Sequence, residues 1–289
     1  MKDGLLQELF CENAMREEAT RMWRKFLRSG GSSGRAVNSI AVALIAFFYL
    51  WFLAAIVRSQ ENWVMPIQSF ELVLLTLVMP ASIYGAISGE RERATWEALI
   101  LTRLTPAQII AGKLFWRVLM VVGVMTVLAV PMVLSQMVGT RGAEHTSFGD
   151  LVRGQTMIFA WGVLLCAFGL WVSANSRRSV TSAALIYSTL FAALILLPML
   201  LAIYGVLTPF QQMDDPVGLT AWLILEFNPF RILTDMSNPV ETRSMGLERA
   251  GWYIAVQGFM QAVFYLLVAG GFVYATHSAL RKLEEPRRR

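Results

Sequence analysis

One polar stretch, from Ser88 to Lys113, interrupts the apolar runs of the chain and packs Glu90, Arg91, Glu92 and Arg93, charges of both signs, into one turn. If residues 90–101 form a helix, Glu90, Arg93 and Glu97 are spaced i, i+3 and i+7 and share one face, beside an apolar stripe. Paired charges of both signs can dock against a complementary protein surface and fix its register. The alternative is an ordinary loop whose charges are only solvated.

A second helix is predicted to begin within the same stretch. Thr105, Pro106 and Gln108 have the pattern of a capping box. In this motif Thr105 is the N-cap, Pro106 takes the first helical position, and the Gln108 side chain reaches back to the cap. The sequence therefore predicts that a helix starts at Pro106.

Few other groups could do chemistry. Glu71 is an ionisable side chain inside an apolar run, and it is a functional candidate because burial of a charge in lipid is costly. A glutamate that reaches water at the level of the lipid headgroups is the alternative. His145 and His277 are the two histidines, and neither has a nucleophile or a set of metal ligands beside it. The motif HExxH is missing, and the pattern GxSxG occurs only as GGSSG at residues 30–34, in a flexible Gly/Ser-rich joint. Both facts argue against a membrane-embedded hydrolase, and the first also argues against a metal site.

The elements that position these groups are membrane helices. The chain has 289 residues, of which 56% are hydrophobic and 16% charged, and its mean hydropathy is +0.53. This composition leaves too little polar surface for a soluble globule, so we predict an all-α polytopic membrane protein. Six apolar runs are long enough to be transmembrane helices: 40–57, 66–87, 118–137, 157–174, 180–207 and 252–276.

Two further segments are predicted to lie at the membrane surface. Within an N-terminal segment, 1–38, apolar residues recur at helical spacing from Met15 to Phe26 and indicate an interfacial amphipathic helix, although a soluble helix packed on the protein is an alternative. Between the fifth and sixth spans, residues 219–225 are apolar but too short to cross. They favour a re-entrant or interfacial external segment over a small extracellular helix. The six-helix domain then covers 39–276, and a basic tail covers 277–289.

The distribution of basic residues sets the orientation. Most of the 25 Lys and Arg residues fall in the N-terminal segment, the stretch 91–117, the turn around Arg177 and the tail. By the positive-inside rule these parts, and both termini, are cytoplasmic. We attribute the net charge of +5 to this topology and to contact with membrane lipids, not to nucleic-acid binding.

Cys11 and Cys166 are predicted to lie in different environments and to be free thiols.

One part of the polar stretch also resembles a family signature. Residues 89–99 read GERERATWEAL, and Leu101-Thr102, Leu104-Thr105-Pro106 and Gly112-Lys113 follow. This pattern is similar to the G-E-R-E-x-G-T-x-E-x-L…T-P-L-S…G-K signature of type 2 ABC exporter permeases. The likeness extends to the whole chain, with a first interfacial helix, six spans, and the signature between spans two and three. The departures are Ala94 where the family often has Gly, Trp96 where it often has Leu, and the sequence around Pro106.

The resemblance implies a transport subunit that is not itself an enzyme. The chain has no Walker A motif, so ATP would be bound by a separate ABC ATPase subunit, and the permease itself needs no cofactor. A cytoplasmic coupling helix would sit in a cleft of that ATPase, and a second permease copy would complete a homodimer or heterodimer in the cell (inner) membrane. A passive channel, a secondary carrier or a membrane scaffold without an ATPase is the alternative.

The resemblance also assigns candidate residues. Trp96 offers a large aromatic anchor for an interface, and Glu71 is the candidate for the transport path. The candidates for ATPase coupling are Glu90, Arg91, Glu92, Arg93, Thr95, Trp96 and Glu97. Family members carry very different substrates, and the sequence does not choose among them.

Overall fold

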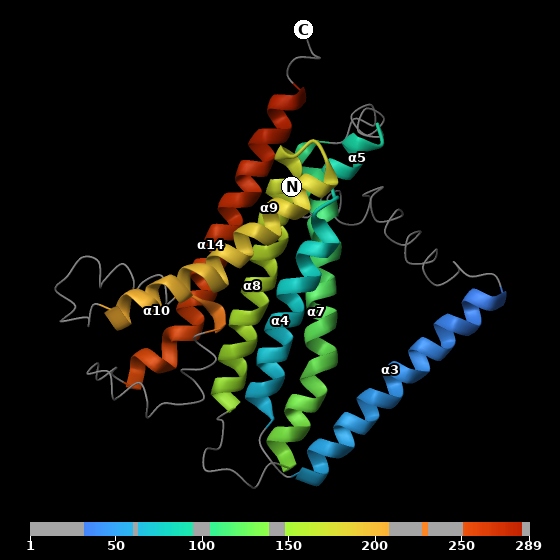
Figure 1. Cartoon of the computed structure of the whole chain (residues 1–289), viewed down its shortest axis with the longest axis vertical. Coiled ribbons are helices and arrows are strands. Elements are labelled where there is room, and N and C mark those ends of the chain that lie inside the picture. The colour runs from blue at the N-terminus through green and yellow to red at the C-terminus, as the bar shows by residue number, and fades with distance from the viewer. Residues whose placement is uncertain are drawn as a thin grey trace, which may run out of the picture.

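The computed structural model describes residues 32–59, 63–94, 105–138, 148–207, 227–230 and 251–284. The elements in these residues are helices (Figure 1). They are α3 (Ser32–Ser59), α4 (Val64–Ile83), α5 (Ser88–Glu92), α7 (Pro106–Val138), α8 (Phe148–Asn175), α9 (Ser179–Phe191), a π-helix (Ala192–Leu196), α10 (Leu197–Leu207) and α14 (Gly251–Glu284). The all-α prediction is confirmed. Residues 1–31 and almost all of 208–250 lie outside the described residues, so the two interfacial segments stay predictions.

Five helical segments of the described chain are long and apolar enough to cross a membrane. They are Val64–Glu92, Pro106–Val138, Phe148–Asn175, Ser179–Leu201 and Gln257–Lys282. These segments contain the second, third and fourth predicted spans and overlap the fifth and sixth, and they confirm the prediction of a polytopic membrane protein. The first predicted span falls in α3, where the apolar helix Ala46–Ser59 is shorter. The count of six spans therefore stays a prediction.

The start of α7 agrees with its capping motif, whereas the start of α8 does not coincide with its apolar run. At the start of α7, the backbone amide of Gln108 donates to Thr105 Oγ1 at 3.3 Å, and the backbone amide of Thr105 donates to Gln108 Oε1 at 2.9 Å. The capping box is thus confirmed. By contrast, α8 begins at Phe148, well before its apolar run, because the polar residues of its first turns find partners: Asp150 pairs with Arg153, and Gln155 contacts Glu71.

Helices α4 and α8 run side by side in the same direction. Helix α8 is the most enclosed of the five segments, since 72% of its most apolar stretch is buried. Three hydrogen bonds join α4 to α8 and a fourth joins the turn after α4 to α8, and all four connect residues that are 83 to 86 positions apart in the sequence. A nearly constant separation is what a parallel pair in fixed register requires. The bonded pairs are Gln68 with Leu151, Glu71 with Gln155, Thr76 with Trp161, and Ile87 with Ser173.

Glycines on α8 allow its neighbours to approach closely. A Cβ atom at Gly154 would lie 2.5 Å from the Gln68 amide nitrogen, and one at Gly162 would lie 2.8 Å from a Val121 methyl. A Cβ atom at Gly169 would overlap the Ile83 Cγ2 methyl. Small residues are the usual means by which membrane helices pack tightly, because the hydrophobic effect does not drive helices together within lipid. On another side, aromatic rings of α8 stack on α14, with Trp161 and Tyr265 centroids 5.2 Å apart.

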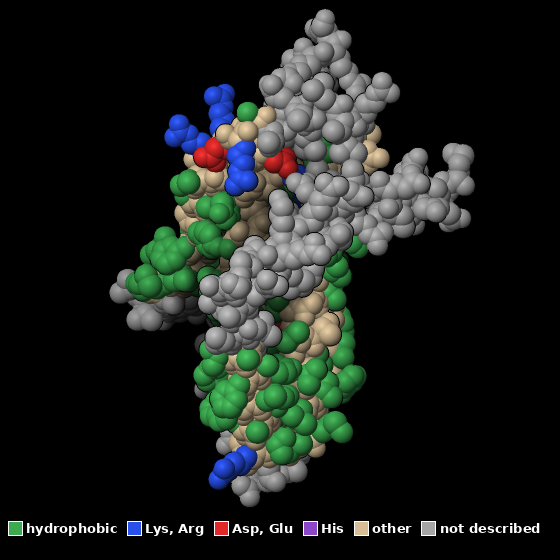
Figure 2. All heavy atoms as spheres, turned by 90° about the vertical axis from the view of Figure 1, so that its right-hand side faces the viewer, with side chains coloured by type: hydrophobic (Ala, Val, Ile, Leu, Met, Phe, Trp, Pro, Cys, Tyr) green, Lys and Arg blue, Asp and Glu red, His purple; other side chains and the backbone are tan. Residues whose placement is uncertain are grey.

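The outer surface is that of a lipid-facing protein. Figure 2 shows hydrophobic side chains over much of the described surface, with most of the charged side chains on that face gathered at the end that carries α5. The turn between α8 and α9 and the C-terminal end of α14 lie at the same end (Figure 1). The fifth span runs obliquely to α4. None of the side chains in its π-helix is buried.

Replacement of Gly169 by Ala tests the close approach of α4 and α8. Since Ile83 is β-branched and fully buried, the added methyl group cannot be accommodated by a rotamer change alone. We expect Gly169→Ala to lower the free energy of unfolding by about 1–3 kcal/mol, measured by SDS titration of the purified protein with circular dichroism. Gly270→Ala is the matched control, because a Cβ atom there meets nothing within 4 Å. Equal stabilities of the two variants would contradict the packing role.

Candidate functional site

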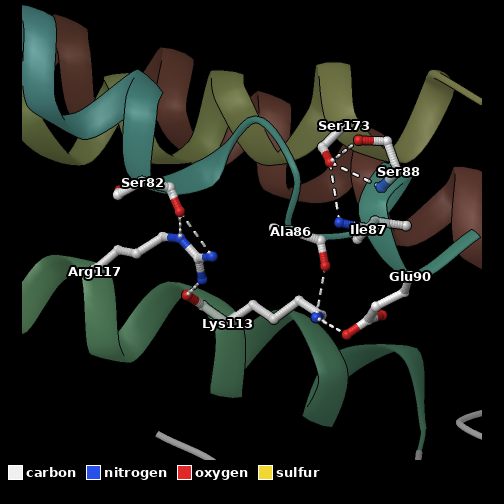
Figure 3. Close-up of polar contacts among 8 residues, drawn as sticks. All are labelled: Ser82, Ala86, Ile87, Ser88, Glu90, Lys113, Arg117 and Ser173. Atoms are coloured by element: carbon white, nitrogen blue, oxygen red, sulfur yellow. Dashed lines mark hydrogen bonds and ion pairs between the residues drawn. The ribbon is translucent and has the colours of Figure 1, made fainter. Parts of the chain in front are cut away.

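The second span is interrupted at the end of the bundle where the charged stretch begins. Helix α4 ends at Ile83, four turn residues follow at 84–87, and the five-residue helix α5 begins at Ser88. We refer to residues 84–87 as the α4–α5 turn. Helix ends leave backbone N–H and C=O groups without intrahelical partners, and such groups must be paired when they are buried. The pairing partners define the candidate site (Figure 3).

Two cations of α7 pair the free carbonyl groups. Lys113 Nζ donates to the Ala86 carbonyl at 2.7 Å and to Glu90 Oε1 at 2.5 Å. Arg117 donates to the Ser82 carbonyl from Nε at 3.2 Å and from Nη2 at 3.1 Å. Lys113 is only 8% exposed, so its ammonium group is compensated almost wholly by the chain itself.

A serine of α8 pairs the free amides. Ser173 Oγ accepts from the Ile87 amide at 3.0 Å and from the Ser88 amide at 3.1 Å, and the Ser88 hydroxyl lies 3.2 Å from it. Ser173 is fully buried. The N-cap residue of α5, Ile87, has no side-chain hydrogen bond of its own to the helix. Ser173 therefore does from another helix what an N-cap serine does within one.

The other end of α5 contacts the fifth span. Glu92 Oε2 accepts from the Ser179 amide at 3.2 Å and from its hydroxyl at 2.5 Å. Ser179 is the first residue of α9, so the carboxylate lies at a helix N-terminus, where a negative charge is favourable. Alternate residues of α5 thus contact three spans: Ser88 contacts α8, Glu90 contacts α7 and Glu92 contacts α9.

The predicted continuous helix over 90–101 is wrong at its centre. Helix α5 ends at Glu92, Arg93 is its C-cap, and Ala94 has a φ of 56°, in the left-handed region. A residue in that conformation ends a right-handed helix, so the helix that carries Glu90 does not continue past Arg93. Glycine is the residue that adopts this conformation at least cost, and Ala94 occupies the position where the signature often has Gly.

The candidate coupling residues lie in different places. The side chain of Glu90 is 22% exposed because it rests against Lys113, whereas Glu92 and Arg93 are exposed. Arg91 is partly buried. Thr95, Trp96 and Glu97 lie outside the described residues, and their roles stay predictions.

Three residues of the site were missed from the sequence: Lys113, Arg117 and Ser173. A signal was present on α7, because Gly112-Lys113 belongs to the signature and Arg117 follows Lys113 by one helical turn. This spacing places the two cations on one face of the helix. Ser173 gave none, because a serine in an apolar helix commonly bonds within its own helix.

Glu71 lies toward the opposite end of α4. Its side chain is fully buried, which excludes the alternative of a glutamate that reaches water at the headgroup level. Oε2 accepts from Gln155 Nε2 at 2.7 Å, while Oε1 has no hydrogen-bond partner among the described residues, and the same holds for Oε1 of buried Gln68. A buried polar atom without a partner is costly and is retained for a reason other than stability.

A family model described as ABC-2 family transporter protein matches residues 58–276, which is more than half of the chain and contains the whole candidate site. No curated protein matches the chain.

Replacement of Ser173 by Ala tests its role as a cap from another helix. The change leaves two buried amides, those of Ile87 and Ser88, without their acceptor. We expect the free energy of unfolding to fall by about 1–3 kcal/mol, and hydrogen exchange at both amides to accelerate. Ser188→Ala is the control, since its exposed hydroxyl bonds only to the Leu185 carbonyl of its own helix. Unchanged exchange at Ile87 and Ser88 would contradict the capping role.

Proposed function

Because the chain belongs to the ABC-2 family of transporters, as a multi-pass membrane permease subunit, we propose that it couples ATP hydrolysis by a separate ABC ATPase subunit to export across the membrane. The observation that carries the proposal is the placement of α5. This short helix lies at one end of the bundle and is hydrogen-bonded to three spans at once. A displacement of α5 by a partner would therefore act directly on α7, α8 and α9.

The ATPase is proposed to dock on α5 and on the chain that follows it. Arg93 is exposed at the end of α5, beyond the contacts with the spans, and can pair with an acidic group of the partner. Trp96 and Glu97 follow within a few residues and supply an aromatic anchor and a charge. Glu90, Arg91, Glu92 and Thr95 complete the proposed coupling set. ATP itself would be held by the partner subunit.

The remaining features follow from the same proposal. The end that carries α5 is cytoplasmic by the positive-inside rule, because most of the described basic residues belong to elements at this end: Arg91, Arg93, Lys113, Arg117, Arg177, Arg178, Arg281 and Lys282. Both termini are cytoplasmic as well. The protein resides in the cell (inner) membrane and works with a second permease copy, identical or related, in contact with lipids. These residues do not indicate which class of substrate the protein transports.

Glu97→Lys tests the docking of the ATPase. The reversed charge would face whatever cationic group of the partner pairs with Glu97, and removal of one member of an interfacial charge pair costs about 2–5 kcal/mol, so retention of the ATPase should fall by at least tenfold. The measurement is co-purification of the ATPase with the permease in mild detergent, together with ATP hydrolysis by the complex.

Lys282→Glu is the matched control, a charge reversal at an exposed site on the same end of the bundle. Retention equal in Glu97→Lys and in the unaltered chain would remove Glu97 from the coupling set. A preparation that carries no ATPase would support a channel, carrier or scaffold instead.

We also propose that Glu71 lies on the transport path. Its unpaired carboxylate oxygen, buried between α4 and α8, is the kind of intramembrane group that substrate or ion pathways use.

Glu71→Gln keeps the size of the side chain and an acceptor for Gln155, and it removes the ionisable group. We expect the ATP turnover of the assembled complex to fall by about fivefold or more, while the amount of bound ATPase is unchanged. Thr126→Val is the control, because the Thr126 hydroxyl is exposed and bonds only to the Val122 carbonyl in its own helix. Normal turnover in Glu71→Gln would assign Glu71 to packing alone.

A further inference from the structure

Lys113 is bonded both within the α4–α5 turn and beyond it. One bond goes to the Ala86 carbonyl, within the turn, and the other to the Glu90 carboxylate, on α5 (Figure 3). A lysine that only neutralised Glu90 would need no contact with Ala86. The two bonds together fix the orientation of α5 relative to the turn and to α7.

The neighbouring contacts extend this fixation back into α4. Arg117 lies one helical turn beyond Lys113 and donates to the Ser82 carbonyl near the end of α4, and its Nη1 donates to the Lys113 carbonyl. The bonds from α7 therefore reach the last turn of α4, the α4–α5 turn and α5 in sequence. Charge-assisted hydrogen bonds in a nearly water-free setting are among the stronger polar contacts in proteins.

A four-residue turn between two helices would otherwise be the natural place for bending. Motion applied to α5 could be absorbed there and would not reach the spans. The hydrogen bonds of Lys113 connect the turn, at Ala86, to α5, at Glu90, and those of Arg117 hold the last turn of α4, so the bonds from α7 together span the place where such bending would occur.

We propose that Lys113 is a positioning residue for transport, which makes α5 move together with α7 as one rigid body when the ATPase changes state. The inference rests on the proposed function, because it concerns how the movement of a bound ATPase is passed on. It assigns to Lys113 a role beyond that of the coupling residues, which contact the ATPase.

The test measures the distance between α5 and α7 in two states of the ATPase. Cys11 and Cys166 are replaced by Ala, and spin labels are attached at Gly89, where a Cβ atom meets nothing within 4 Å, and at Leu119, which is 45% exposed on α7. Distances are recorded by double electron–electron resonance in the complete complex, without nucleotide and after trapping with ATP and vanadate. In the unaltered chain we expect the same distance in both states.

Lys113→Met removes the donors and keeps a long side chain, so we expect the distance to shift on trapping and its distribution to broaden. Lys113→Arg keeps the charge and the donors, so the distance should again be the same in both states. If Lys113 acted through packing alone, Arg would not be expected to restore it. Lys282→Met, at an exposed site on the same end, is the charge-matched control. Should Lys113→Met fail to assemble, Glu90→Gln weakens the same connection with the shape conserved and should give a smaller shift.

The outcomes separate the two proposals. A complex that hydrolyses ATP, but whose α5–α7 distance changes on trapping in the unaltered chain, would overturn the role of Lys113 and leave the proposed function standing. The same holds if neither Lys113→Met nor Glu90→Gln differs from the unaltered chain. A preparation with no ATPase, or one without ATP hydrolysis, would overturn the proposed function and this inference with it.

Discussion

The structure depends on one constraint: a helix that is interrupted near the membrane must have its freed backbone groups paired. The second span is interrupted after Ile83, and the surrounding helices supply the partners. Cationic side chains of α7 take the carbonyl groups, and the Ser173 hydroxyl of α8 takes the amides. Pairing of the backbone therefore brings α7 and α8 against the same few residues. The contacts that satisfy the interruption are also the contacts through which α5 can act on the spans.

The parallel register of α4 and α8 relates the two ends of the molecule. Glu71 and the α4–α5 turn belong to the same helical pair, and both are bonded to α8 at nearly the same sequence separation. The glycines of α8 keep the pair close, so neither helix can rotate far without a clash. A shift of this pair at the α5 end must then be accompanied by a shift near Glu71. The constant register thus gives a physical connection between the proposed ATPase contact and the proposed path.

Most features set by neighbouring residues could be predicted from the sequence, whereas contacts between residues far apart in the chain were missed. Hydropathy located five of the spans, because length and apolar composition are properties of a continuous run. The start of α7 was predicted to the residue, because the capping box lies within four positions. The end of α5 was missed, since helical spacing assumes an unbroken helix and gives no sign of the left-handed Ala94. The bonds of Ser173 join positions 85 and 86 residues apart, a distance at which one sequence carries no pattern.

The distribution of charge on α5 also constrains the partner. Glu90 is paired with Lys113, and Glu92 is bonded at the N-terminus of α9, so the acidic groups of this helix are already engaged within the chain. Arg93, by contrast, is exposed at the end of this helix. If an ATPase binds this end, a complementary cleft should present acidic groups to Arg93. On this argument Glu90 and Glu92 connect α5 to the spans, and Arg93 is an exposed charge of α5 that a partner can reach.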